Sequence, residues 1–230
     1  MSFELPLFPL NVVLFPGMPL PLHIFEPRYR LMIGRCLEAD RAFGVAQIAD
    51  GSEGASGTVP QSVGTVAEII EVAPFADGRM NLQTVGTRRF EILSIRETDD
   101  YLIGTCEWLE DDPELDDLWG IAHQTRRILS RYFDSLSQNT ELSADLGALD
   151  VPQDPFALSM FIGAILSLPS DQKQQLLEMT STRQRLELEE FLLERADLVQ
   201  RAFSKHAAHG YLQPPSDSNL GQFANFVSLN

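Results

Sequence analysis

Residues 4–37 read ELPLFPLNVVLFPGMPLPLHIFEPRYRLMIGRCL, and this stretch organises the rest of the chain. As far as residue 21, its apolar residues are interrupted by five prolines, at positions 6, 9, 16, 19 and 21. Proline has no N–H to give to a strand ladder, so it is confined to edge strands, strand ends and bulges. We therefore expect short edge strands here and no continuous central strand.

Two local signals indicate how the chain turns within this stretch. The order Phe15-Pro16-Gly17 predicts a type II turn, because proline presets the first turn position and glycine tolerates positive φ at the second. After a strand over 20–25, Glu26 and Pro27 predict a helix start, where a carboxylate faces the positive helix end and proline loses no hydrogen bond. An apolar stripe follows at helical spacing, formed by Tyr29, Met32, Ile33, Cys36 and Leu37.

Alternating apolar residues predict further strands downstream, at 43–49, 62–75, 80–85, 89–96 and 101–109. Asp77-Gly78 lies between two of them and predicts a hairpin with a tight primed turn. These six or seven short strands, with one helix and no regular βαβ alternation, predict a mostly antiparallel barrel or sandwich.

The character of the sequence changes at residue 110, where the acidic run EDDPELDD precedes a helical pattern. Further helices are predicted at 154–166, 170–179 and 181–205, and the first of these is apolar nearly all round. We expect an α+β chain with three parts: a β-rich subdomain over 1–110, a helical bundle over 111–205 and a flexible tail over 206–230.

Charge limits the classes of partner. The 230-residue chain has 33 acidic residues against 17 lysines and arginines, which gives a net charge of −16. A wide phosphate-binding surface would face strong repulsion, so nucleic acid is not expected as a partner. Arginine clusters such as Arg88-Arg89 could form an anion site, but salt bridges to nearby carboxylates are the commoner outcome.

The two cysteines and the amino terminus bear on the compartment. Cys36 and Cys106 fall on a predicted helix face and in a predicted strand, where buried reduced thiols are common. The amino terminus is acidic and broken by proline, unlike a secretory signal, and no apolar run approaches the roughly 18 residues of a membrane span. We expect a cytoplasmic protein without a membrane segment.

Several segments together resemble one known family. Residues 5–33, LPLFPLNVVLFPGMPLPLHIFEPRYRLMI, are similar to the opening of the amino-terminal substrate-recognition domain of the Lon protease family, in the form that also occurs as a stand-alone protein. The resemblance continues through 43–48, 63–69, 85–90 and 101–111. It implies a PUA-like β-rich subdomain followed by a helical bundle, without catalytic machinery.

Motifs for chemistry are missing from the sequence. There is no GxxxxGK[ST] phosphate loop, and neither Lys173 nor Lys205 lies in a context that resembles the Lon serine-lysine pair. His23 and Glu26 flank a strand-to-helix corner, but two candidate ligands do not define a zinc site. We expect no catalytic residue, no cofactor and no metal.

The first functional hypothesis is a module that binds unfolded or extended polypeptide, as an adaptor in protein quality control with a protease or chaperone as a further partner. Edge strands and adaptable apolar side chains bind extended peptides. On that basis the predicted substrate-binding residues are Phe15, Met18, Leu20, Phe25 and Tyr29. The apolar tail residues Phe223 and Phe226 are a candidate occupant, in cis or through weak self-association.

Three alternatives stay open at this point. Phe15 and Met18 could be ordinary core residues, which the sequence favours at least as strongly as a binding role. A PUA-like fold could instead bind a small molecule or RNA, although the acidic charge argues against RNA. An ATP-dependent hydrolase, suggested by the family name alone, is the weakest alternative because the catalytic motifs are missing.

Overall fold

A computed structural model describes residues 1–51, 57–97, 101–113, 117–137 and 150–207. The chain divides into two compact units. The first comprises Met1–Glu110 with Leu168–Thr180, and the second comprises Asp111–Ser167 and the chain from Ser181 onward. Strands and helices are both present, which confirms the α+β class. The predicted tail residues Phe223 and Phe226 lie outside the described residues.

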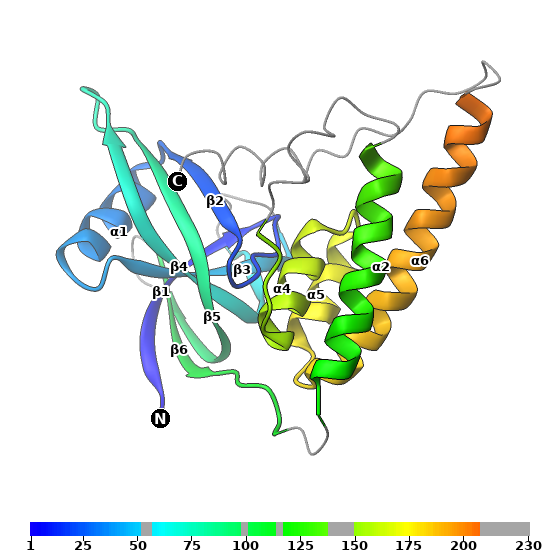
Figure 1. Cartoon of the computed structure of the whole chain (residues 1–230). Helices are drawn as coiled ribbons and strands as arrows, with labels where there is room; N and C mark the ends of the chain where they lie inside the picture. The colour runs from blue at the N-terminus through cyan, green and yellow to red at the C-terminus, as the bar shows by residue number, and fades with distance from the viewer. Residues whose placement is uncertain (52–56, 98–100, 114–116, 138–149, 208–230) are drawn as a thin grey trace. The chain divides into compact units, whose positions relative to one another are not determined.

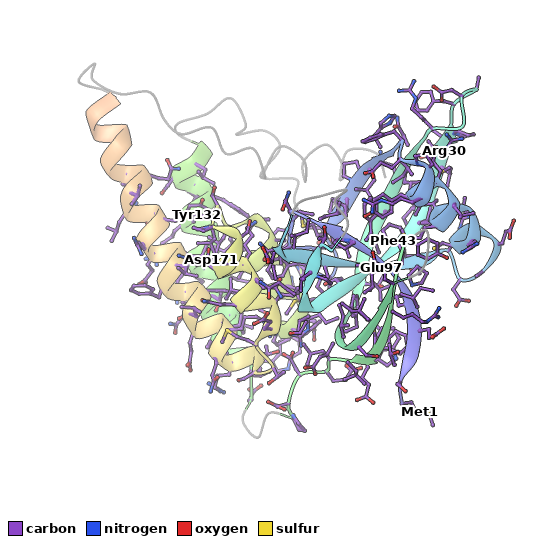
Figure 2. All side chains as sticks on the ribbon, turned by 180° about the vertical axis from the view of Figure 1, so that it is seen from behind. Met1, Arg30, Phe43, Glu97, Tyr132 and Asp171 are labelled. Carbon is purple, nitrogen blue, oxygen red and sulfur yellow. The ribbon has the colours of Figure 1, made fainter. Side chains whose placement is uncertain are left out.

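The described residues of the first unit form a six-stranded sheet and two helices (Figures 1 and 2). Its strands are β1 (Phe3–Leu10), β2 (Pro19–Ile24), β3 (Ala42–Asp50), β4 (Val59–Pro74), β5 (Met80–Glu97) and β6 (Leu102–Trp108), and its helices are α1 (Pro27–Glu38) and α5 (Ser170–Glu178). The strand order is β2-β5-β4-β3-β1-β6, and β6 also pairs with β5. This extra pairing closes five strands into a barrel and leaves β2 attached to β5. Among these pairs only β1–β3 is parallel, so the sheet is mostly antiparallel, as predicted.

Strand β1 has a neighbour on each side, which corrects the expectation that prolines exclude a central strand. Leu7 pairs with Gly44 of β3 and with Leu102 of β6, and it is the single residue that belongs to both ladders. Pro6 precedes the β3 ladder, and Pro9 follows the end of the β6 ladder. Each proline therefore lies where β1 lacks one neighbour, so neither ladder needs the missing N–H.

The predicted turn between β1 and β2 is confirmed. The Met18 N–H donates to the Phe15 carbonyl at 3.0 Å, and Gly17 has φ of +79°. Gly86 in β5 lies against this turn, because a Cβ at position 86 would be 2.3 Å from the Phe15 carbonyl oxygen. The Thr65 hydroxyl donates to the Leu14 carbonyl at 2.6 Å. The turn between β1 and β2 therefore packs against β4 and β5 of the first unit.

The hairpin between β4 and β5 forms as predicted, but its turn is not a primed one. Gly78 has φ of +83°, whereas Arg41 is the only described non-glycine residue with positive φ. Asp77 therefore lacks the conformation that a type I′ turn requires. Its carboxylate instead accepts hydrogen bonds from the Arg79 backbone N–H at 3.1 Å and from the Arg79 side chain at 2.7 Å. These hydrogen bonds lower the pKa of Asp77.

Helix α1 packs through its predicted apolar stripe. Its buried residues are Tyr29, Met32, Ile33 and Cys36. Pro27 lies in the first turn and Glu26 precedes it as the N-cap residue, as the sequence indicated. Both cysteines are free and buried, and burial raises the pKa of each thiol to about 11.

Helix α5 belongs to the first unit, although the sequence placed it in a helical bundle over 111–205. The buried Arg89 of β5 donates hydrogen bonds of 2.7 Å to the carbonyls of Leu177 and Met179, at the carboxyl end of α5. The Gln174 side chain donates to the Val63 carbonyl of β4 at 3.0 Å. A cation at a helix carboxyl terminus is favourable, and these contacts join α5 to the sheet.

The second unit contains three described helices: α2 (Trp119–Ser137), α4 (Pro155–Ile165) and α6 (Thr182–Ala207). Helix α4 is largely buried, as its apolar sequence predicted, and the Asp154 carboxylate caps it by accepting from the Ala157 N–H at 2.9 Å. Polar pairs join α2 to α6, including Thr125 with Glu190 at 2.8 Å. Among the described helices, none has the length and apolar character that crossing a membrane requires.

Two ionisable side chains lie buried one turn apart on α6. The Arg185 guanidinium donates to the Asp111 carboxylate at 2.7 Å and to the Ser159 hydroxyl at 2.8 Å. Glu189 is fully buried, and neither of its carboxylate oxygens has a hydrogen-bond partner. Burial raises the pKa of Glu189 well above its ordinary value, against an opposing effect of Arg185.

Candidate functional site

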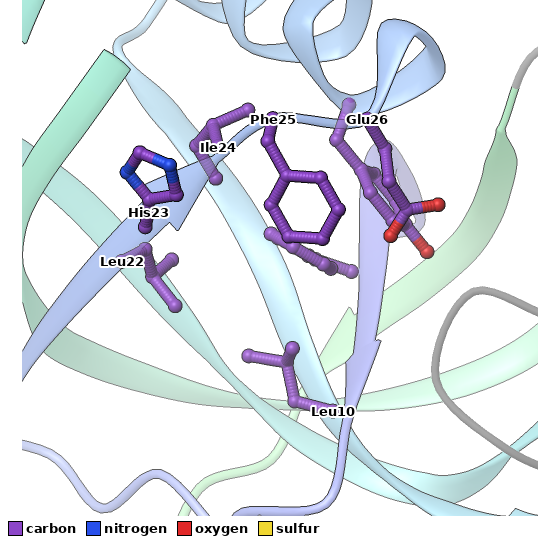
Figure 3. Close-up of a pocket in the computed structure, with 8 residues that line it drawn as sticks. Leu10, Leu22, His23, Ile24, Phe25 and Glu26 are labelled. Atoms are coloured by element: carbon purple, nitrogen blue, oxygen red, sulfur yellow. The ribbon is translucent and has the colours of Figure 1, made fainter. Parts of the chain in front are cut away.

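A cavity of about 330 Å³ lies in the first unit between β1 and β2 (Figure 3). Six of its eight lining residues are apolar. The lining residues come from β1, from β2 and from the chain that leads into the start of α1. We call it the β1–β2 cleft; its lining residues are Phe8, Leu10, Leu22, His23, Ile24, Phe25, Glu26 and Tyr29.

The cleft exists because β1 and β2 do not pair with each other. The β6 ladder ends at Leu7, so the following residues of β1 have no strand on that side among the described residues. Strand β2 pairs with β5 on one edge, and no described strand pairs with its other edge. Pro9 on β1 and Pro19 and Pro21 on β2 cannot donate backbone hydrogen bonds across this gap. The prolines that open the sequence thus lie along the gap between the barrel strand β1 and the attached strand β2.

Stacked rings form a wall of the cleft. The Phe8 and Tyr29 rings stack with centroids 4.0 Å apart and an interplanar angle of 27°. The Arg28 guanidinium lies 4.5 Å from the Tyr29 ring centroid, and its Nε is 3.1 Å from a Glu26 carboxylate oxygen. Stacking and cation–π contacts hold the two rings in place without a ligand, so the wall is preformed.

Phe25 is the exposed aromatic residue of the cleft. Its side chain is at the corner between β2 and α1, and the residue is 58% exposed. Figure 3 shows its ring directed toward Leu10 across the cavity. Exposed large apolar side chains beside a concave apolar surface are typical of binding sites.

The aromatic surface continues beyond the cleft. The His23 ring lies 6.0 Å from the Phe25 ring and 5.9 Å from the Phe75 ring, measured between centroids. Phe75 is exposed near the β4–β5 hairpin, where the Arg79 guanidinium is 5.6 Å from its ring centroid. We call His23, Phe25 and Phe75 the aromatic rim.

The polar side chains at the cleft form a hydrogen bond and an ion pair with neighbouring side chains and do not form a catalytic arrangement. His23 Nδ1 is 2.6 Å from the Asn81 side-chain oxygen, so the two side chains are joined by a hydrogen bond. Glu26 is paired with Arg28. Across the described part of the chain, no group of three or more His, Cys, Asp or Glu side chains could hold a metal ion. The arrangement is suited to holding an apolar ligand.

Of the five residues predicted to bind substrate, two line the cleft and three are buried away from it. Phe25 and Tyr29 line the cleft. Phe15 has no exposed surface, and Met18 and Leu20 are also buried, so these three are packing residues in this conformation. Their burial supports the alternative in which Phe15 and Met18 belong to the core. A binding role for Phe25 and Tyr29 stays a prediction.

Sequence reasoning missed Leu10, Leu22 and Phe75. Leu10 and Leu22 lie on opposite sides of the cleft, although β1 and β2 are at separate places in the sheet order. A pattern within one strand does not reveal that two unpaired edges face each other. For Phe75, the available signal was its position at the end of a predicted strand, next to the predicted hairpin.

The first unit thus combines a mostly antiparallel β-barrel with an apolar cleft between β1 and β2. The family model described as the ATP-dependent protease La (LON) substrate-binding domain matches residues 4–195. The chain belongs to this family.

Curated relatives include longer proteins of the same family. The chain is 28% identical over 180 residues to Lon protease 1 of Hydrogenovibrio crunogenus, a match that covers 77% of this chain and 22% of the relative. It is 31% identical over 189 residues to Lon protease 2 of Herpetosiphon aurantiacus, covering 80% of this chain and 23% of that protein. The chain thus spans about a quarter of the length of these relatives.

Solved structures agree with the family assignment. A Lon N-terminal domain protein from Xanthomonas campestris superposes with a TM-score of 0.60 at 29% identity, covering 81% of this chain and 96% of that one. The N-terminal domain of the Mycobacterium avium complex Lon protease superposes with a TM-score of 0.63, covering 84% of this chain and 98% of that one. At 19% identity, the second similarity concerns the fold alone.

Proposed function

We propose that this protein is a non-catalytic recognition module that binds extended or unfolded polypeptide, with an apolar side chain of the polypeptide in the β1–β2 cleft. The observation that carries the proposal is the preformed apolar cleft with Phe25 exposed at its side. Membership of a substrate-binding domain family supports the same role.

The size of the cleft indicates weak binding. A cavity of about 330 Å³ is at the small end of ligand pockets, so it suits one large side chain rather than a folded partner. Burying one aromatic side chain contributes about 1.5 to 3 kcal/mol, and ordering the peptide opposes this gain. We expect micromolar or weaker affinity, as a module that must release its polypeptide requires.

An adaptor role rests on the relatives, which are named Lon proteases. In that role the module would pass bound polypeptide to a protease or chaperone in the cytoplasm. We expect the purified protein alone neither to hydrolyse ATP nor to cleave an unfolded protein. ATP-dependent cleavage above the background of a contaminant-free preparation would contradict a non-catalytic role.

The experiment compares two exposed apolar residues of the first unit. Fluorescence anisotropy would report binding of labelled, reduced and carboxymethylated α-lactalbumin, which is permanently unfolded. Phe25→Ser should weaken binding about ten-fold, because it removes roughly 1 to 2 kcal/mol of apolar contact. Leu93→Ser is the matched control, since Leu93 is 53% exposed on β5 and does not line the cleft. Equal effects of the two substitutions would argue for nonspecific adhesion to apolar surface.

A further inference from the structure

The pairing of β2 with β5 determines which backbone groups of β2 point outward. The Gly86 N–H donates to the Met18 carbonyl at 2.9 Å, and the register continues with Pro19 opposite Val85 and Leu20 opposite Thr84. Hydrogen-bonding residues alternate along an antiparallel strand. Even-numbered residues of β2 therefore bond to β5, and the backbone groups of odd-numbered residues point to the outer edge.

The outer edge consequently offers more acceptors than donors. Pro21 and His23 are the exposed odd-numbered residues of β2, and Pro21 has no N–H. Pro19 points the same way and is buried. On the two exposed residues, the outward groups are thus the carbonyls of Pro21 and His23 and the N–H of His23. No described strand pairs with this edge, and His23 also lines the β1–β2 cleft.

We propose that the polypeptide binds as an added strand on the outer edge of β2, where alternate backbone N–H groups of the polypeptide donate to the carbonyls of Pro21 and His23, and a backbone carbonyl of the polypeptide accepts from the His23 N–H. One of its apolar side chains enters the β1–β2 cleft. This inference rests on the proposed function and specifies its ligand: an extended segment without proline at the donating positions. Backbone hydrogen bonds are the same for most residue types, so recognition tolerates many sequences.

The backbone groups on the outer edge of β2 favour pairing with a peptide over pairing with a second copy of this chain. An ordinary extended peptide carries an N–H at every residue and can supply both missing donors. Two β2 edges paired with each other would place prolines at the outward positions of both strands and leave carbonyls without donors. Prolines on an edge strand disfavour self-pairing for this reason.

A scan of backbone N-methylation tests the inference. The probe is a short fluorescein-labelled peptide of alternating threonine and valine with a central phenylalanine and terminal lysines. Each amide is methylated in turn, and affinity is measured by anisotropy. We expect the loss of affinity to alternate along the peptide, with a period of two residues. Methylation of either donating amide should weaken binding about ten-fold, and methylation of the amides between them should change it less than about two-fold. Equal affinity for all methylated peptides would overturn strand addition.

Two substitutions at one position provide the matched control. His23→Pro removes the outward N–H, whereas His23→Ala keeps it, and both lose the ring and its bond to Asn81. Since this N–H does not face β5, both variants should keep the thermal transition of the parent. His23→Pro should bind the unmethylated peptide about five-fold more weakly than His23→Ala. Equal binding by the two folded variants would contradict a role for this edge.

The outcomes separate the two proposals. Binding of unfolded α-lactalbumin with loss on Phe25→Ser, but without periodicity in the methylation scan, would leave the recognition function standing and overturn strand addition. Failure of the protein to bind either probe would overturn the recognition function and strand addition with it.

Discussion

The rings of Phe8 in β1 and Tyr29 in α1 stack with their centroids 4.0 Å apart. Both residues are buried, and both line the β1–β2 cleft. The stack joins the first strand to the first helix, so the shape of the cleft depends on the same residues that fix the fold. A ligand therefore meets a site that is already formed, which lowers the ordering cost of binding.

Filling the cleft should block binding without unfolding the protein. Leu22→Trp adds a large side chain to a half-buried position beside existing space, so we expect little change in the thermal transition and at least five-fold weaker binding of unfolded α-lactalbumin. Leu93→Trp is the control on the same sheet. Undiminished binding by a folded Leu22→Trp variant would place the binding surface elsewhere.

Gly86 should be irreplaceable for a steric reason. A Cβ at this position would be 2.3 Å from the Phe15 carbonyl oxygen, so Gly86→Ala must displace the backbone of the turn. We expect it to lower the free energy of unfolding by about 2 kcal/mol, measured by urea denaturation. The control is Gly34→Ala in α1, where the added Cβ meets nothing within 4 Å and should raise stability by up to about 1 kcal/mol. A neutral Gly86→Ala would mean that the turn moves freely.

Arg89 should hold α5 against the sheet. Arg89→Met removes the hydrogen bonds to the carbonyls of Leu177 and Met179, and we expect a loss of about 2 to 3 kcal/mol with faster amide exchange in α5. Arg88→Met is the control, because Arg88 is an exposed partner of Glu110 and should change stability by less than about 1 kcal/mol. Unchanged exchange in α5 of the Arg89 variant would show that other contacts suffice to hold it.

Glu189 should make stability fall as pH rises. Its pKa is raised in the folded state, so above the ordinary glutamate pKa the folded chain keeps a proton that the unfolded chain releases. The stabilising contribution is complete below the unfolded-state pKa and declines as pH rises toward the folded-state pKa. Glu189→Gln should remove this decline and be more stable than the parent at neutral pH. Parallel pH profiles of urea midpoints for the two proteins would contradict this assignment.

The sequence was most informative where a signal is local. The type II turn at Phe15 to Met18, the start of α1 at Pro27 and the start of α4 at Asp154 each depend on a few neighbouring residues, and all three are present. The mostly antiparallel sheet also followed from the strand pattern. In the hairpin, Asp77-Gly78 correctly indicated a turn, but hydrogen bonds from Arg79 to the Asp77 side chain accompany a different turn geometry.

Features that depend on distant partners were missed. Sequence alone did not distinguish Arg89 from its neighbour Arg88, yet the first binds carbonyls of α5 and the second pairs with Glu110. The prolines predicted edge strands, but Pro6 and Pro9 lie within one strand, β1, that has a neighbour on each side. The open cleft between β1 and β2 became apparent only from the strand order. This is why Phe15 was selected for binding although it is fully buried.

The claim that polypeptide binds in the β1–β2 cleft can be tested by methyl NMR during titration with unfolded α-lactalbumin. We expect the methyl resonances of Leu10, Leu22 and Ile24 to shift or broaden in a saturable manner, because these side chains line the cleft. Exposed methyl groups outside it, on Ile70, Leu93 and Ile95, should change little. Saturable changes at Ile70, Leu93 or Ile95, with the three cleft residues unaffected, would contradict the claim.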